Sequence, residues 1–177
     1  MIIIMRKYRK WETMRIIGID PGYAIVGFGV IEYERRIFDV IDYGAVTTDA
    51  GTDFNTRLLE IYNDICVILD RYKPEAMAIE RLYFTSNQKT AIAVAEARGI
   101  VLLAARQRNI DIYEYTPLQV KSSVTGYGKA VKKQVQELTR NILKLPEIPK
   151  PDDTADALAI AVCHAHTSRS HLPTIMN

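Results

Sequence analysis

The stretch IIGIDPG at residues 16–22 joins an apolar β-strand to a carboxylate at the point where a Pro-Gly pair ends the strand. Isoleucine is β-branched and fits a buried strand, whereas proline and glycine favour turns. Asp20 is therefore either an ordinary turn residue or a charged side chain that a rigid strand holds in place. This stretch alone leaves both interpretations open.

The segments that follow predict an α/β domain with a mixed sheet. The predicted strands cover residues 14–20, 24–33, 36–47, 76–80 and 111–115, and the first three form an antiparallel meander. The predicted helices cover residues 53–73, 87–107, 116 to the TGYG segment at 125–128, 131–143, and Asp152 or Asp153 to 166. Strands that alternate with helices after a meander indicate a sheet with helices on its faces.

The length and composition predict one domain with a substantial core. The chain has 177 residues and is 48% hydrophobic, and we assign the domain to residues 14–168. Residues 1–13 are expected to be an N-terminal extension, with a misassigned start codon as one interpretation, and 169–177 a flexible tail. Cys66 and Cys163 lie in helical segments, which favours reduced thiols and a cytoplasmic protein. No apolar run approaches the roughly 20 residues of a membrane span.

The charge is unevenly distributed along the chain. The formal net charge is +2, yet residues 116–150 carry +5 and residues 1–13 carry +3, so the remainder is acidic. Such segregation is typical of a surface that binds a polyanion, although a solvated basic helix explains it equally well.

Four carboxylates are placed where they could converge. Asp20 and Glu80 each end a short apolar strand, and Asp153 and Asp156 share one face of the final helix at a spacing of three residues. Crowded carboxylates raise one another's pKa values unless a cation neutralises them. An all-oxygen set suits Mg²⁺ or Mn²⁺. Paired ions of this kind promote phosphodiester cleavage.

Each of these carboxylates also has a purely structural interpretation. Asp20 before Pro-Gly could be a turn residue, and Glu80 could be a salt-bridge partner at a strand end. Asp152 or Asp153 could cap the final helix. Spacing does not separate Asp152 from Asp153, because both share a face with Asp156.

Five collinear motifs resemble the RuvC family of bacterial Holliday-junction resolvases. They are GIDPG at 18–22, AIERLYF at 78–84, EARGI at 96–100, VKSSVTGYGKAVKKQV at 120–135 and DDTADALAIAVCHAH at 152–166. The resemblance implies a ribonuclease H-like fold, a five-stranded mixed sheet flanked by helices. It also implies that Asp20, Glu80, Asp153 and Asp156 are the catalytic residues and metal ligands, and that Asp152 is not. The implied cofactor is two Mg²⁺ ions, for which Mn²⁺ can substitute.

The resemblance further implies contacts with DNA. The residues expected to bind DNA are Arg81, Tyr83, Phe84, Lys121, Lys129, Lys132 and Lys133. Lys121 and Lys132 correspond to lysines near the cut phosphate. Tyr83 corresponds to an aromatic residue that stacks on an unpaired base, and Phe84 is a rival for that role. Arg81 stands where the family often has glutamine and adds a positive charge beside the metal site.

The predicted function is a Mg²⁺-dependent endonuclease that makes paired, symmetric nicks in four-way DNA junctions during homologous recombination and DNA repair. The two-fold symmetry of the junction favours a homodimer, and the nearly all-apolar helix at 87–107 could meet both the sheet and a second subunit. The resemblance adds the RuvA–RuvB branch-migration complex as a partner. Two alternatives remain: a junction-binding module without catalysis, and an actin-like or sugar-kinase-type phosphotransferase, which usually needs a second, adenosine-binding half.

Overall fold

A five-stranded sheet forms the centre of the computed structural model, which describes residues 13–82 and 88–168. The strands are β1 Met14–Asp20, β2 Ile25–Glu34, β3 Ile37–Thr47, β4 Ala76–Glu80 and β5 Asp111–Tyr115. Their order in the sheet is β3-β2-β1-β4-β5. Pairing is antiparallel from β1 to β3 and parallel from β1 through β4 to β5, so the predicted meander and mixed sheet are confirmed.

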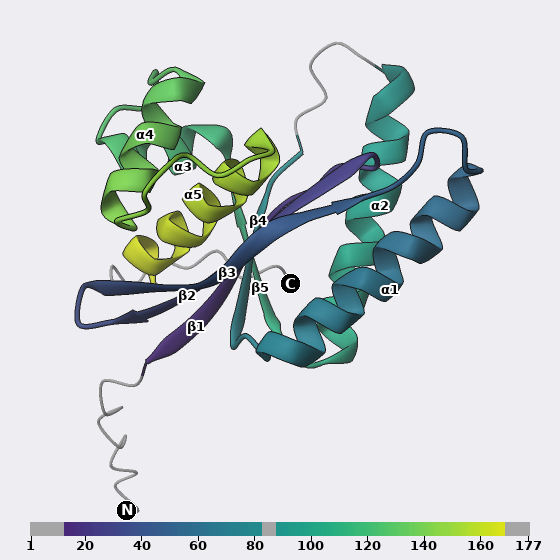
Figure 1. The fold of residues 1–177 in the computed structure, drawn as a ribbon, viewed down its shortest axis with the longest axis horizontal. Helices are drawn as coiled ribbons and strands as arrows, with labels where there is room; N and C mark the ends of the chain where they lie inside the picture. The colour runs from purple at the N-terminus through teal and green to yellow at the C-terminus, as the bar shows by residue number, and fades with distance from the viewer. Residues whose placement is uncertain (1–12, 83–87, 169–177) are drawn as a thin grey trace, which may run out of the picture.

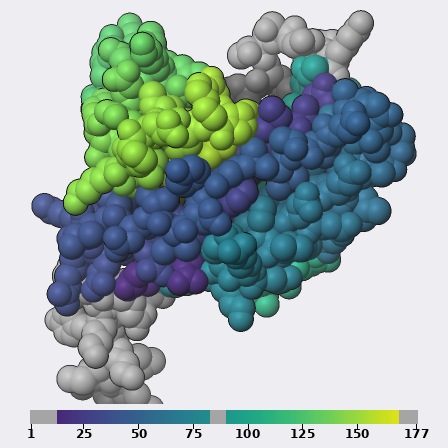
Figure 2. Space-filling view, viewed as in Figure 1, coloured from purple at the N-terminus to yellow at the C-terminus, as the bar shows by residue number. Residues whose placement is uncertain are grey.

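Helices lie on both faces of this sheet (Figure 1). The helices are α1 Phe54–Tyr72, α2 Gln88–Gln107, α3 Pro117–Thr125, α4 Lys132–Ile142 and α5 Asp152–Thr167. In the space-filling view, α3, α4 and α5 form one lobe beside the strands, and α1 lies on the other side (Figure 2). Helix α5 packs on β1 and β2, while α3 and α4 pack on α5.

The start of α5 corrects one structural interpretation of the aspartates. Neither Asp152 nor Asp153 is the N-cap, because Pro151 occupies that position with φ −63° and ψ 174°. Both aspartates lie in the first helical turn, where a carboxylate interacts favourably with the positive end of the helix dipole. Asp153 is therefore not required for capping.

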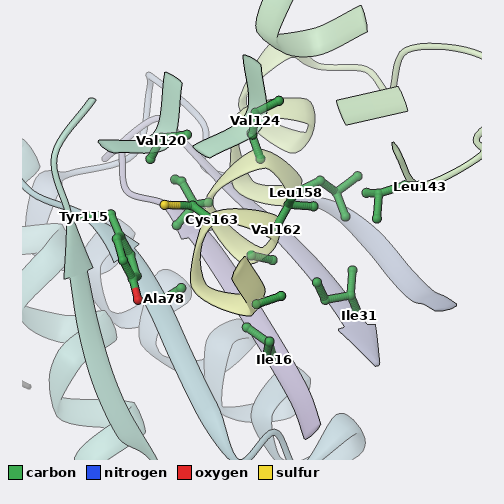
Figure 3. Packing of buried hydrophobic residues seen from close by; sticks show 14 of the residues in the cluster. Ile16, Ile31, Ala78, Tyr115, Val120, Val124, Leu143, Leu158, Val162 and Cys163 are labelled. Atoms are coloured by element: carbon green, nitrogen blue, oxygen red, sulfur yellow. The ribbon is translucent and has the colours of Figure 1, made fainter. Parts of the chain in front are cut away.

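Apolar side chains pack on each face of the sheet. On the α5 side, Ile16 and Ile31 pack with Leu158 and Val162 of the helix (Figure 3). The α5 segment is almost entirely buried, as its ALAIAVC sequence predicts. Helix α5 also lies unusually close to the strands, because a Cβ on Gly18 would be only 2.0 Å from the carbonyl oxygen of Ala157.

Two further predictions concern the cysteines and the membrane. Cys66 and Cys163 are both free thiols, and Cys163 is buried. Burial raises the pKa of Cys163 to about 11, so this thiol is protonated and inert at neutral pH. Within residues 13–82 and 88–168, no helix is both long enough and apolar enough to cross a membrane.

Candidate active site

Two parallel strands deliver the first pair of carboxylates. Asp20 is the last residue of β1 and Glu80 the last residue of β4, and the two strands are neighbours paired through Ile19 and Ile79. The carboxyl ends of adjacent parallel strands meet at the same edge of the sheet. The strand positions predicted for Asp20 and Glu80 therefore bring both side chains to one edge.

Helix α5 brings the second pair to the same edge. Asp20 of β1 is paired with Gly27 of β2. A Cβ on Gly27 would lie 2.1 Å from the carbonyl oxygen of Asp153, so the first turn of α5 rests against the strand next to Asp20. Asp156 lies one turn further along α5. Close approach of helix and sheet at a glycine thus positions Asp153 beside the strand-borne carboxylates.

The sequence did not lead us to single out Gly27, although a signal was present. Gly27 and Gly29 alternate along β2 and therefore share one face, and Gly29 pairs with Gly18 of β1. Glycine inside a strand weakens it and often marks the close approach of another backbone. Three glycines on neighbouring strands therefore indicated where the helix would rest.

Replacing Gly27 by alanine is expected to displace α5 and with it Asp153. The added methyl group meets backbone rather than a flexible side chain, so we expect the free energy of unfolding to fall by about 1–3 kcal/mol. Cleavage per folded molecule should also fall, by about tenfold or more, because sub-ångström placement governs such sites. Thermal unfolding and DNA cleavage assays measure the two effects. Gly51→Ala is the control, since its Cβ would meet no atom closer than 3.5 Å.

The carboxylates interact strongly with one another. The pKa of Asp20 is raised to about 8, first by burial and then by the charges of Glu80, Asp156 and Asp153. Burial, followed by the charge of Asp156, also raises the pKa of Glu80. Within the described residues, the Asp20 carboxylate accepts no hydrogen bond. A turn-stabilising aspartate normally accepts one from the backbone, so the structural interpretation of Asp20 lacks its expected contact.

Lysines balance part of this negative charge. Lys132 Nζ lies 2.8 Å from Asp156 Oδ2 and 3.6 Å from Asp152 Oδ2. Asp152 is also 3.3 Å from Lys150, and it is not among the charges that raise the pKa of Asp20. Asp156 shares Lys132 with Asp152. Of the aspartates on α5, however, only Asp153 and Asp156 raise the pKa of Asp20, which favours these two as the site residues of α5.

A cavity of about 230 Å³ opens between β4 and the lobe formed by α3, α4 and α5. Its polar lining consists of Glu80, Asp156, Lys121 and Lys132, and its remaining lining, from those three helices, is apolar. Lys121 and Lys132 both lower the pKa of Glu80, against the larger upward effects. The cavity thus presents carboxylates and ammonium groups side by side, as binding of a metal ion and a phosphate requires.

Three other residues expected to bind DNA, Lys129, Lys133 and Arg81, do not line this cavity. Lys129 and Lys133 have exposed side chains on the loop before α4 and in its first turn, and Arg81 is exposed just after β4. Arg81 is not among the charges that shift the pKa of Asp20 or Glu80. Tyr83 and Phe84 lie outside the described residues, as do residues 1–12 and 169–177.

The donor set is chemically suited to a hard divalent cation. All four groups are carboxylates, and oxygen donors are those that Mg²⁺ and Mn²⁺ prefer. Within the described part of the chain, however, no three acidic, histidine or cysteine side chains lie close enough together to hold an ion. Mutual repulsion keeps carboxylates apart without a cation, and Asp156 is engaged by Lys132. The residues fit the ion in chemistry, but they do not form a closed ligand shell in this conformation.

The fold and the carboxylate cluster define a ribonuclease H-like protein of the nuclease class. The family model for crossover junction endodeoxyribonuclease RuvC matches residues 16–164. A RuvC from Ruminiclostridium cellulolyticum is 54% identical over 156 residues, covering 88% of this chain and 94% of the relative. A RuvC from Caldicellulosiruptor saccharolyticus is 52% identical over 160 residues, covering 90% and 96%.

Structural similarity agrees with these sequence matches. The structure of T. thermophilus RuvC in complex with a Holliday junction substrate superposes with a TM-score of 0.87 at 35% identity, covering 92% of this chain and 99% of that one. The chain belongs to the RuvC family of crossover junction endodeoxyribonucleases. The family and the ribonuclease H-like fold predicted from the five motifs are therefore confirmed.

Proposed function

We propose that this protein resolves four-way DNA junctions, with Asp20, Glu80, Asp153 and Asp156 as its catalytic carboxylates. The observation that carries this assignment is the geometry: Asp20 and Glu80 end neighbouring parallel strands, and the first turn of α5, which bears Asp153, rests on Gly27 beside Asp20. The raised pKa of Asp20 is consistent with this arrangement. Four carboxylates gathered around a strand end repel one another and destabilise the fold, and a bound cation removes this cost. Family membership supplies the reaction, endonucleolytic cleavage at a crossover junction.

Nucleases of this family depend on a metal, and we assign two Mg²⁺ ions to the four carboxylates, with Mn²⁺ as a substitute. Bound there, the ions would supply an activated water and neutralise the departing oxygen. The chain's own contribution is to position the four side chains. Asp20 and Glu80 lie at the ends of rigid strands, and Asp153 and Asp156 lie on α5, which packs closely against Gly27. Lys121 and Lys132 on the cavity wall would hold the phosphate being cut.

One assay tests this function directly. A labelled synthetic four-way junction is incubated with the protein and Mg²⁺, and the cuts are mapped on all strands. We expect paired cuts at symmetric positions in two opposed strands. Binding without cuts would favour the non-catalytic junction-binding module, and cuts in linear duplex at the same rate would contradict selectivity for the junction.

Lys121→Ala and Lys132→Ala are each expected to weaken cleavage and to flatten the salt dependence of junction binding. Each phosphate that a lysine neutralises contributes about 0.9 to the slope of log affinity against log salt on duplex DNA. Titrations at several salt concentrations measure the slope. Arg71→Ala is a suitable control, because this exposed arginine lies on α1, on the opposite face of the sheet. Slopes that stay unchanged in both lysine variants would remove these residues from the DNA interface.

The remaining DNA contacts are proposed on the family resemblance. Lys129 and Lys133 extend the basic surface from the cavity along α4, and Arg81 adds a charge at the end of β4. Tyr83 or Phe84 would stack on an unpaired base at the junction centre, a contact worth about 1–3 kcal/mol per base. The RuvA–RuvB branch-migration complex is the partner that the resemblance proposes.

A homodimer is proposed because paired nicks need two opposed sites. Helix α2 offers a surface for it: Ile92 is 66% exposed and Leu103 is 50% exposed. Gly99 lies between them on the same stripe, and a Cβ added there would meet no atom within 4 Å. Small and apolar residues that face solvent along a helix can pack closely against a second copy.

Sedimentation is expected to give about twice the protomer mass of 20.1 kDa at micromolar concentration and moderate salt. Leu103→Glu should shift the protein to the protomer mass, because it places an unpaired charge within the proposed interface. Cuts by this variant should become unpaired. A protomer mass for the parent protein would contradict the dimer.

A further inference from the structure

Arg98 is a largely buried arginine in the EARGI motif to which the proposed reaction gives no role. It lies on α2, and its side chain is only 12% exposed. Its Nε donates a 3.3 Å hydrogen bond to the carbonyl oxygen of Glu80. Its Nη2 forms an ion pair with the carboxylate of Glu114 on β5. A single guanidinium therefore joins α2, β4 and β5 at the point where β4 ends.

The backbone of Glu80 has few other anchors. The β1–β4 ladder ends at the pair Ile19 and Ile79, and Pro21, just beyond β1, has no N–H to donate. On the other side, Glu80 pairs with Tyr115, and Arg81 N donates to Tyr115 O at 2.8 Å. The strand assignment stops at Glu80. Arg98 thus supplies a donor to the last peptide carbonyl of the strand that carries Glu80.

The ion pair with Glu114 makes this donor rigid. A guanidinium is planar and stays charged at all accessible pH values, so its donors have fixed directions once one of them is bound. Glu114 is also largely buried, with 20% of its side chain exposed. A buried charge of this kind is retained only when it is paired and hydrogen-bonded, and Arg98 meets both conditions.

We infer that Arg98 is a positioning residue for cleavage, which holds the backbone of Glu80 so that its carboxylate faces the cavity shared with Asp156. This role rests on the proposed function, in which Glu80 is a metal ligand. Arg98 is distinct from Lys121 and Lys132, because its burial keeps it from contacting a DNA phosphate. It acts through Glu80 alone, so its loss should alter metal dependence more than junction binding.

The test compares Arg98→Gln and Arg98→Lys with the parent protein. Arg98→Gln should raise the Mg²⁺ concentration for half-maximal cleavage and lower the single-turnover rate, together by about 10- to 100-fold, the range seen when partners of metal ligands are lost. Junction affinity measured in Ca²⁺ should stay within about twofold of the parent. Arg98→Lys keeps the charge beside Glu114 but loses the planar guanidinium. Its Mg²⁺ requirement and cleavage rate should therefore lie between those of the parent protein and of Arg98→Gln.

Arg108→Gln is the matched control. Like Arg98, Arg108 lies on the α2 side of the molecule and pairs with a carboxylate, here through both Nε and Nη2, each 2.7 Å from Asp70, but this pair does not contact Glu80. The Arg108→Gln substitution should lower the melting temperature without changing the Mg²⁺ concentration that cleavage requires. If Arg98→Gln behaves in the same way, with normal cleavage per folded molecule, the positioning role is overturned. If Arg98→Gln fails to fold, Arg98→Lys provides the same comparison.

Glu80→Gln separates this inference from the proposed function. Loss of cleavage in Glu80→Gln together with an unchanged Mg²⁺ requirement in both Arg98 variants would overturn only the role of Arg98. Normal cleavage by Glu80→Gln would remove Glu80 from the catalytic set and the positioning role with it. The expected result is loss of cleavage in Glu80→Gln together with a raised Mg²⁺ requirement in both Arg98 variants.

Discussion

Asp20→Asn is expected to reduce junction cleavage by about a thousandfold or more, because it removes a largely buried negative charge that the other three carboxylates of the proposed metal site surround. Asparagine keeps the shape of the side chain and is as good as aspartate before a Pro-Gly turn. Junction binding should survive, and without metal it should improve at a pH above about 8, where Asp20 of the parent protein is ionised and its negative charge faces the DNA phosphates. Single-turnover cleavage in Mg²⁺ measures the first effect, and junction binding in EDTA at pH 7 and pH 9 measures the second.

The same substitution should stabilise the metal-free protein. The pKa of Asp20 is about 8 in the folded protein, against an ordinary value of 3.8. Between these values the folded state binds the proton more tightly, so this group lowers stability progressively as pH rises from about 4 to 8. Asparagine abolishes that loss, and the melting temperature at pH 8 without metal should rise. Cleavage within about tenfold of the parent at saturating Mg²⁺ would contradict the metal-site assignment.

The other three carboxylates should behave in the same way. Glu80→Gln, Asp153→Asn and Asp156→Asn would each disrupt the same bound ions, so a double variant should be hardly worse than a single one. Additive losses would instead indicate that the groups act independently.

The apparent affinity for Mg²⁺ is expected to rise by about tenfold per pH unit up to pH 8, and to level off above it. Binding of the cation requires ionised carboxylates, and the proton on Asp20 competes with it at every pH below its pKa of about 8. Glu80, whose pKa is also raised by burial and by Asp156, would steepen the dependence at lower pH. Between pH 6 and 8 the change should therefore reach about a hundredfold.

Mg²⁺ titrations of cleavage at a series of pH values, with binding of Mn²⁺ followed by electron paramagnetic resonance, measure this dependence. The Mn²⁺ measurement needs no DNA and so excludes effects of pH on the junction. An affinity that is flat between pH 6 and 8 would mean that Asp20 is already ionised without metal, and that its neighbours lie farther away than the structure places them.

Most of the secondary structure could be predicted because its signals are local. The β-branched run that ends at Pro-Gly in IIGIDPG, the three- and four-residue steps in 53–73 and the Thr116–Pro117 start of α3 each depend on neighbours in the chain. The observed elements agree with the predictions to within a residue or two. The N-cap of α5 was missed because Pro151 takes a position that aspartate usually fills.

Contacts between distant segments could not be predicted in this way. The approach of Asp153 to Gly27, the ion pair between Lys132 and Asp156, and the bond from Arg98 to Glu80 each join elements far apart in sequence. Periodicity and spacing say which face of an element a residue occupies, but not which other element covers that face.

The sequence by itself determined the chemistry of the proposed site: four carboxylates without a histidine or cysteine among them, two at strand ends and two on one helix face. It also determined the family, through five motifs in a fixed order. Only the tertiary structure decided that the pKa of Asp20 is raised and that Asp152 pairs with Lys132. The reason is physical, since a pKa depends on burial and on distances to other charges, and both arise when α5 packs against the glycines of β1 and β2.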